Sequence, residues 1–129
     1  MQIVTLDFET FYDKQYSLTK LTTEQYIRDY RFETVGVATK INENEATWCS
    51  GDHSEIQNYL DAIDWDDSIM VAHNAMFDAA ILSWQFGIKP KRIADTLSMS
   101  RAIDGVNVKH SLAAACARLG LELHLILRP

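Results

Sequence analysis

The sequence predicts an α/β fold, in which helices pack on a sheet of mixed strand direction. Near the N-terminus, β-branched and apolar runs are separated by polar turn residues, which is typical of antiparallel strands. Further along, short apolar runs alternate with segments of helical spacing, which is typical of parallel strands joined by helices. We therefore expect three antiparallel strands, then parallel strands, with flanking helices.

The strands follow from apolar runs bounded by turn residues. Ile3–Phe8 is almost continuously apolar, which predicts a central strand buried on both faces. Ser68–His73 is a short apolar run that follows a predicted helix, so we expect it to lie parallel to the first strand. The remaining predicted strands are Phe32–Ile41, Ala46–Cys49 after a turn at Asn42–Asn44, and the short Ile93–Asp95.

The helices follow from apolar spacing and from capping residues. Thr22 with Gln25 three residues later predicts a capping box, and Gly87 and Gly120 predict helix ends. Helices are expected over Thr22–Ile27, Ser54–Ile63, Phe77–Phe86, Leu97–Ile103 and Ser111–Leu119. The three tryptophans, Trp48, Trp65 and Trp84, are interpreted as core residues.

Length and composition indicate the class of protein. The 129 residues suffice for one domain with a real core, spanning 1–129. No apolar run approaches the ~20 residues that cross a bilayer, and the N-terminus lacks a signal-peptide pattern. Cys49 and Cys116 do not make a disulfide framework. We expect a soluble, cytoplasmic protein that does not enter a membrane.

The charges are distributed unevenly along the chain. The net charge is −6, and residues 41–88 contain nine acidic residues and no Lys or Arg. From Lys89 onward there are seven basic residues and three acidic ones. Two interpretations stay open: a basic side that meets a phosphate backbone while an acidic region collects metal, or a solvated surface with chance asymmetry.

Two carboxylates at the end of the first strand are candidates for chemistry. Asp7 and Glu9 are two residues apart, so both side chains project from the same face of the strand. Paired acids at the end of a buried strand repel each other and lose hydration, and a divalent cation offsets both costs. The alternative is a strand end that turns into solvent.

A third carboxylate comes from the next strand-to-helix junction. If Asn74 caps the helix, Asp78 lies one turn later, on the same face as Ile81 and Leu82. A carboxylate on this inward face needs a partner. The alternatives are an Asp78 stabilised only by the helix dipole and, for Asp95, a plain helix cap.

Four segments together resemble the DEDD (DnaQ-like) 3′–5′ exonuclease superfamily. They are Asp7-Phe8-Glu9-Thr10, Ala72-His73-Asn74-Ala75-Met76-Phe77-Asp78, Asp95-Thr96 and His110-Ser111-Leu112. The chain is most similar to the N-terminal proofreading domain of phage-type family A DNA polymerases. The resemblance implies a ribonuclease H-like fold and hydrolysis of the 3′-terminal phosphodiester with two Mg²⁺ or Mn²⁺ ions.

The resemblance also implies roles for single residues and for partners. Asp7, Glu9 and Asp78 match the catalytic, metal-binding carboxylates. The positions that match substrate-binding residues are Thr10, His73, Asn74 and Phe77. The implied partners are the 3′ end of single-stranded DNA and a DNA polymerase domain, in cis or in trans.

The chain departs from the family pattern near its end. The family has a fourth carboxylate four residues after a Tyr or His, and here the nearest candidate, His124, is followed by Arg128. We therefore expect the C-terminal part of the domain to be missing and the activity of this chain to be weak or absent. Two alternatives stay open: a catalytically dead fragment that binds nucleic acid or packs against a polymerase, and an RNA 3′–5′ exonuclease of the same superfamily.

Overall fold

A five-stranded mixed sheet forms the centre of the protein. The structure is a computed structural model, and it describes residues 1–121. The strands are β1 (Gln2–Thr10), β2 (Thr34–Ile41), β3 (Thr47–Ser50), β4 (Ser68–Ala72) and β5 (Arg92–Asp95), in the spatial order β3-β2-β1-β4-β5. β1 pairs antiparallel with β2 and parallel with β4, and β4 pairs parallel with β5. The predicted α/β fold and strand directions are confirmed.

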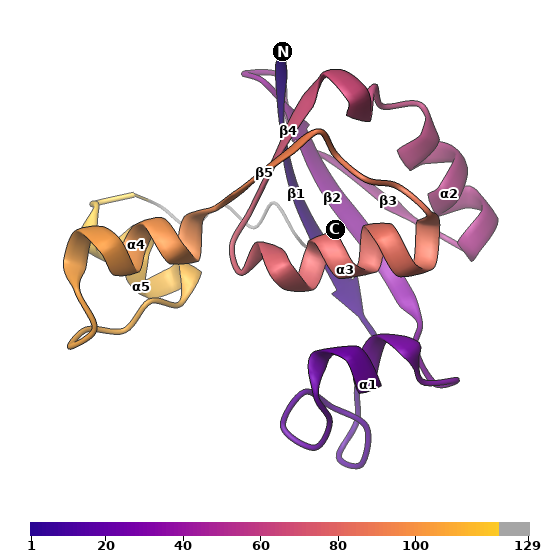
Figure 1. Cartoon of the computed structure of the whole chain (residues 1–129), viewed down its shortest axis with the longest axis horizontal. Coiled ribbons are helices and arrows are strands. Elements are labelled where there is room, and N and C mark those ends of the chain that lie inside the picture. The colour runs from indigo at the N-terminus through magenta and orange to yellow at the C-terminus, as the bar shows by residue number, and fades with distance from the viewer. Residues whose placement is uncertain (122–129) are drawn as a thin grey trace.

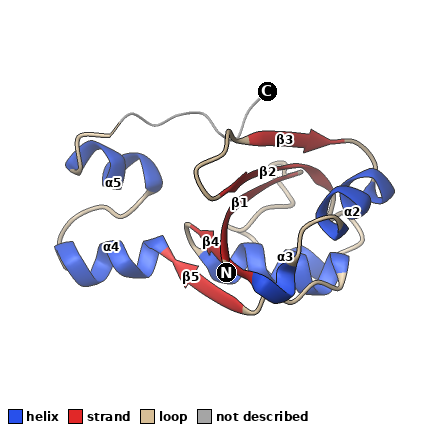
Figure 2. Ribbon diagram, turned by 90° about the horizontal axis from the view of Figure 1, so that it is seen from above, coloured by secondary structure: helices blue, strands red, loops and turns tan. Residues whose placement is uncertain are grey.

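The helices are arranged in two groups around this sheet (Figure 1). They are α1 (Thr23–Arg28), α2 (His53–Asp61), the short 3₁₀ helix η1 (Trp65–Asp67), α3 (Ala75–Phe86), α4 (Thr96–Asp104) and α5 (Leu112–Arg118). α2 and α3 lie on one face of the sheet, whereas α4 and α5 lie beyond its edge (Figure 2). Within residues 1–121, no helix combines the length and apolar character that crossing a membrane requires.

Local capping sets several helix ends as predicted. The Thr22 hydroxyl accepts from the backbone N–H of Gln25, and the Gln25 side chain accepts from the N–H of Thr22. Ser111 caps α5 through the N–H of Ala114. Gly87 ends α3 with a positive φ of 67°, which glycine adopts without strain. These bonds satisfy backbone groups that a helix terminus leaves without partners.

The hydrophobic core lies on one side of the sheet. Val4, Leu6 and Phe8 of β1 are buried against α2 and α3, and the Phe8 ring stacks on Phe86. The neighbouring residue Ile3 faces the other way and is 47% exposed. The prediction that β1 is buried on both faces is therefore wrong, because the described helices cover only the face of Leu6 and Phe8. We call the opposite face, which carries Ile3, Thr5, Asp7 and Glu9, the open face.

A β-bulge in β2 lies opposite the end of β1. Glu9 pairs with Gly36, but Thr10 pairs with Thr34, so Val35 has no partner across the ladder. Bulges bend a strand and redirect its side chains, and they are frequent beside active sites. This one lies where β1 presents Glu9.

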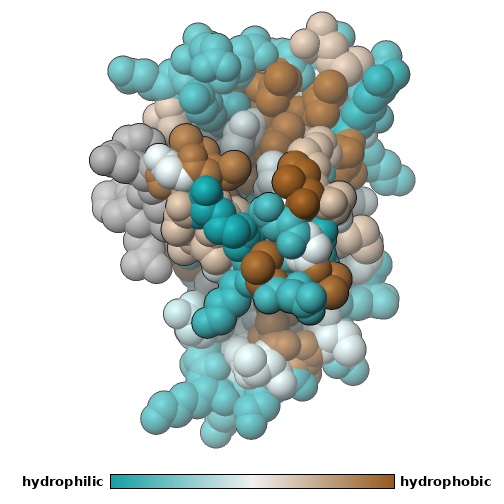
Figure 3. Space-filling view, turned by 90° about the vertical axis from the view of Figure 1, so that its left-hand side faces the viewer, coloured by the Kyte–Doolittle hydropathy of each residue, from teal (hydrophilic) through white to brown (hydrophobic). Residues whose placement is uncertain are grey.

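Helices α4 and α5 and the loop between them (residues 96–118), which we call the α4–α5 unit, are held together by Arg118. Its Nε lies 3.0 Å from the Asp104 carboxylate, and its Nη2 donates to the Ser100 hydroxyl over 3.0 Å. Figure 3 looks onto this end of the molecule and shows apolar side chains in separate patches among polar ones. Exposed apolar residues of this unit include Ile103 and Val106.

Candidate active site

Asp7 and Glu9 project from the open face at the C-terminal end of β1. Both side chains are half-buried. Partial burial raises the pKa of Asp7 to about 6, and the negative charge of Glu9 adds to the rise. The two carboxylates therefore repel each other as predicted, and a cation between them would relieve that repulsion.

Asp78 reaches β1 from helix α3. It is 3% exposed, and Ile81 and Leu82, on the same face of α3, are fully buried, so the predicted inward face is confirmed. Its Oδ1 accepts a hydrogen bond from the backbone N–H of Phe8 over 3.1 Å. β4 pairs with β1 only as far as Thr5, so beyond that point the edge of β1 is met by Asp78 instead of a strand.

The electrostatic environment of Asp78 disfavours its charged form. Burial raises the pKa of this carboxyl to about 8, and the charges of Asp7 and Asp95 add to the rise. The hydrogen bond from Phe8 lowers the pKa but does not outweigh burial. Without a cation, burial therefore favours the uncharged form of Asp78. A strongly shifted carboxyl beside a second acidic group is typical of functional sites.

The three carboxylates suit a divalent metal by their chemistry, although they approach β1 from two sides. Oxygen ligands are what Mg²⁺ and Mn²⁺ prefer. Asp7 and Glu9 come from the open face, whereas Asp78 comes from the α3 side and ends at the strand edge. Within residues 1–121, no three Asp, Glu, His or Cys side chains lie close enough to hold a metal together. The metal site formed by these three residues stays a prediction.

Thr10 and Phe77 lie next to a buried tyrosine that sequence reasoning missed. The Tyr26 hydroxyl donates to the carbonyl of Phe11 over 2.5 Å. Because that hydroxyl has one hydrogen, the 2.8 Å contact with Thr10 must be donated by Thr10. The half-buried Phe77 ring lies 6.1 Å from the Tyr26 ring. Tyr26 thus ties α1 to the end of β1, through contacts that no local sequence signal indicates.

Asn74 occupies the N-cap position of α3 but does not cap it with its side chain. Its backbone is left-handed (φ 68°, ψ 58°), and its side chain makes no capping hydrogen bond. The prediction that Asn74 caps the helix is therefore wrong in its mechanism. The capping acceptor is Asp95, whose Oδ1 accepts from the backbone N–H of Asn74 over 2.9 Å. The exposed Asn74 side chain stays a predicted substrate contact.

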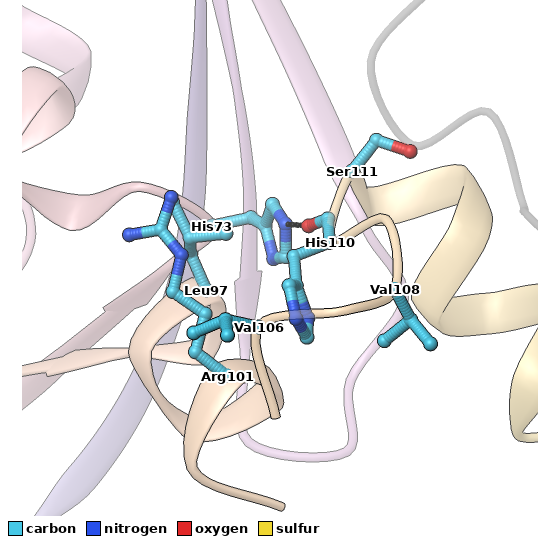
Figure 4. Close-up of a pocket in the computed structure, with 7 residues that line it drawn as sticks. All are labelled: His73, Leu97, Arg101, Val106, Val108, His110 and Ser111. Atoms are coloured by element: carbon cyan, nitrogen blue, oxygen red, sulfur yellow. Dashed lines mark hydrogen bonds between the residues drawn. The ribbon is translucent and has the colours of Figure 1, made fainter. Parts of the chain in front are cut away.

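His73 points toward α4 and α5. Its Nδ1 lies 2.9 Å from the Thr96 hydroxyl, and its Nε2 lies 2.6 Å from the carbonyl oxygen of His110. Figure 4 shows this second bond at the wall of a cavity of about 420 Å³. The lining residues are His73, Leu97, Arg101, Val106, Val108, His110 and Ser111. His73 thus joins β4 to the α4–α5 unit, and its role toward substrate stays a prediction.

The tryptophans do not share one environment. Trp65 is buried in the core, as predicted, but Trp84 is 40% exposed, with the Arg28 guanidinium 4.2 Å from its ring centroid. Trp48 lies half-buried over Gly36, where a Cβ would come within 2.4 Å of the indole. Gly36 pairs with Glu9, so the indole lies beside the end of β1, the strand that carries Asp7 and Glu9. The core interpretation was wrong for Trp84, because α3 buries only one of its faces.

The predicted departure from the family pattern falls at His124 and Arg128. Both lie outside the described residues.

Comparison with known families decides the classification. The sequence model of a family described as 3′–5′ exonuclease matches residues 4–124. The chain belongs to this 3′–5′ exonuclease family. The match covers every segment on which the resemblance was based, and the assignment to the DEDD superfamily is confirmed.

One curated relative of this exonuclease chain is a DNA polymerase. DNA polymerase III PolC-type of Mycoplasma genitalium is 40% identical over an alignment of 74 residues, and the alignment covers 53% of this chain and 5% of that protein. The chain therefore spans a small part of the length of this relative.

Solved structures of Brucella melitensis NrnC share the fold. NrnC superposes with a TM-score of 0.67 at 19% identity, over 91% of this chain and 52% of that one. NrnC with bound Mg²⁺ gives 0.69 at 18% identity, over 95% and 55%, and NrnC bound to pGG gives 0.65 at 20%, over 91% and 52%. The exonuclease chain has the predicted ribonuclease H-like fold and spans about half the length of these structures.

Proposed function

We propose that this chain acts as a metal-dependent 3′–5′ exonuclease on the 3′ end of single-stranded DNA, with weak activity because Arg128 stands where the family pattern has its fourth carboxylate. The observation that carries the proposal is the hydrogen bond between Asp78 and Phe8, which brings a buried carboxylate to the backbone between Asp7 and Glu9. Two Mg²⁺ or Mn²⁺ ions, when bound, supply an activated water and stabilise the leaving 3′ oxygen. Asp7, Glu9 and Asp78 are the residues that would hold them.

The chain's own residues provide the surroundings of the reacting end. Thr10 follows Glu9 directly, and Asn74 precedes the helix turn that carries Asp78. The Asn74 side chain is exposed and makes no capping hydrogen bond, so it can contact the terminal nucleotide. The Thr10 hydroxyl is held in place by Tyr26.

The biological setting we propose is proofreading, in a polymerase chain or in a separate subunit beside one. Support comes from the PolC-type relative, in which the matched 74 residues are 5% of a much longer DNA polymerase. A second candidate is an RNA 3′–5′ exonuclease, because the metal chemistry is shared and one structure of the same fold is NrnC bound to pGG. A third is a binding fragment without catalysis.

A single assay separates these candidates. Single strands of DNA and RNA with the same sequence, labelled at the 5′ end, are incubated with Mn²⁺ and with EDTA. We expect a ladder that shortens from the 3′ end of the DNA only with metal. Asp7→Asn and Asp78→Asn should each reduce the rate about 10²–10⁴-fold, whereas the exposed Asp66→Asn should not.

Other outcomes contradict the proposal in different ways. Faster shortening of RNA than DNA supports the second candidate. Binding of the strand without shortening supports the third. Cleavage that persists in EDTA or in the Asp7→Asn variant would falsify the proposed site.

A further inference from the structure

Asp95 lies at a junction of two helices and two strands. It is the last residue of β5, pairs with Ala72 at the end of β4, and is the N-cap of α4. Its Oδ1 accepts from the backbone N–H of Leu97 over 3.0 Å, and its Oδ2 accepts from the Ser98 hydroxyl over 3.0 Å. These bonds account for a plain helix cap, the structural role that the sequence suggests.

The same carboxylate also serves helix α3. Its Oδ1 accepts from the backbone N–H of Asn74 over 2.9 Å, and the backbone N–H of Ala75 lies near enough to help lower the pKa of Asp95. Burial raises the pKa of Asp95, but its hydrogen bonds outweigh burial and the net shift is downward. Asp95 is thus an ionised acceptor, and an anion at a helix N-terminus is stabilised by the helix dipole.

The second set of bonds replaces the usual cap of α3. An Asn at an N-cap ordinarily uses its side chain to accept from an N–H in the first turn. Asn74 does not, because its backbone is left-handed, a conformation that has a free-energy cost for residues other than glycine. The bonds to Asp95 offset that cost and leave the Asn74 side chain exposed.

We infer that Asp95 is a positioning residue of the candidate active site. Its carboxylate caps α3 from outside the helix, holds Asn74 in the left-handed conformation, and thereby sets where the first turn of α3 places Asp78. This inference rests on the proposed function for its link to metal and substrate. The cap itself can be tested without either.

The test compares Asp95→Ala with Ser98→Ala in the full chain. Ser98→Ala removes a bond to Asp95 that belongs to α4 only, so it is the matched control. In the metal-free protein, amide hydrogen exchange at Asn74 and Ala75 should become about tenfold faster in Asp95→Ala, as loss of ~1.4 kcal/mol of hydrogen bonding implies. Ser98→Ala should exchange like wild type at both amides.

Metal binding supplies the second measurement, together with a rescue. The rise in melting temperature caused by Mn²⁺ should fall by at least half in Asp95→Ala and stay unchanged in Ser98→Ala. Adding Asn74→Gly to Asp95→Ala should restore most of the Mn²⁺ response, because glycine adopts a positive φ without help. A purely structural loss would not be repaired by that change.

The outcomes separate this inference from the proposed function. Amide exchange at the wild-type rate at Asn74 and Ala75 in Asp95→Ala overturns the inference. A folded Asp95→Ala, Asn74→Gly variant whose Mn²⁺ response is not restored overturns it as well. If Asp95→Ala does not fold, Asp95→Asn replaces it, because Asn keeps an acceptor oxygen but has no charge. Amide exchange in Asp95→Asn should accelerate by less than tenfold. Exchange at the wild-type rate in Asp95→Asn would overturn the inference. If wild type itself shows no Mn²⁺ response, the proposed metal site fails, and the exchange measurements alone decide the role of Asp95.

Discussion

The carboxylate of Asp78 accepts a hydrogen bond from the backbone N–H of Phe8, 70 residues earlier in the chain. Phe8 lies between Asp7 and Glu9, so this bond fixes helix α3 against the part of β1 that presents the other two carboxylates. The bond also buries Asp78 where its charge is unfavourable. In the metal-free protein, the charged form of Asp78, which is the form that would bind a cation, is therefore the form that destabilises the fold.

Divalent metal should stabilise the fold. A ligand that binds only the folded state raises stability by mass action, and here it also relieves repulsion among Asp7, Glu9 and Asp78. The melting temperature should rise with millimolar Mg²⁺ or Mn²⁺, measured by calorimetry or circular dichroism. The Asp7→Asn, Asp78→Asn double variant should lose this response, while Asp66→Asn keeps it. An equal rise in wild type and double variant would show that metal binds elsewhere.

Asp78→Asn should change how stability depends on pH in EDTA. The folded-state pKa of Asp78, about 8, is above the ordinary 3.8, so the folded state binds the proton more tightly than the unfolded chain. The stabilisation is complete below pH 3.8 and is lost as the pH rises through 8. The variant should match wild type near pH 4 and exceed it by a few kcal/mol near pH 9.

Urea unfolding of both proteins from pH 4 to 9 measures this difference. Asn keeps an oxygen that can accept from Phe8, so the substitution isolates the charge. Asp66→Asn, at an exposed carboxylate, should follow the wild-type curve. An Asp78→Asn curve that runs parallel to wild type over the whole range would mean that Asp78 is not held in an unfavourable charged state.

Tyr26→Phe should loosen the end of β1. The substitution removes the hydroxyl that donates to Phe11 and accepts from Thr10, at a cost of about 1–2 kcal/mol in unfolding free energy. Tyr12→Phe, at a tyrosine that is 73% exposed, is the control and should be neutral. Chemical denaturation compares the two. Equal effects at the two tyrosines would argue that the buried hydroxyl contributes nothing.

Gly36→Ala should destabilise the sheet next to Glu9. A Cβ at this position would lie 2.4 Å from the Trp48 indole and 2.8 Å from the carbonyl oxygen of Cys49, so the indole or the strand must shift. We expect a loss of roughly 1–3 kcal/mol. In a Trp48→Ala background the penalty should shrink without vanishing, because the carbonyl contact remains. An undiminished penalty would mean that Trp48 is not the obstacle.

Several local features followed directly from the sequence. The capping box of Thr22 and Gln25, the cap at Ser111 and the helix end at Gly87 depend on neighbouring residues, so short-range patterns predict them. The inward face of α3 followed from the spacing of Asp78, Ile81 and Leu82. The parallel direction of β4 relative to β1 followed from the helix that precedes β4.

The sequence by itself therefore determined the elements, their order and the three candidate carboxylates, because periodicity and caps are local. Only the tertiary structure decided that β1 is covered on one face, that Asp78 bonds to Phe8, and that Asp95 replaces Asn74 as the cap of α3. The last two contacts join residues 70 and 21 positions apart. Hydrogen bonds between residues so far apart in the chain depend on how the helices and strands pack. No single segment of the sequence determines that packing.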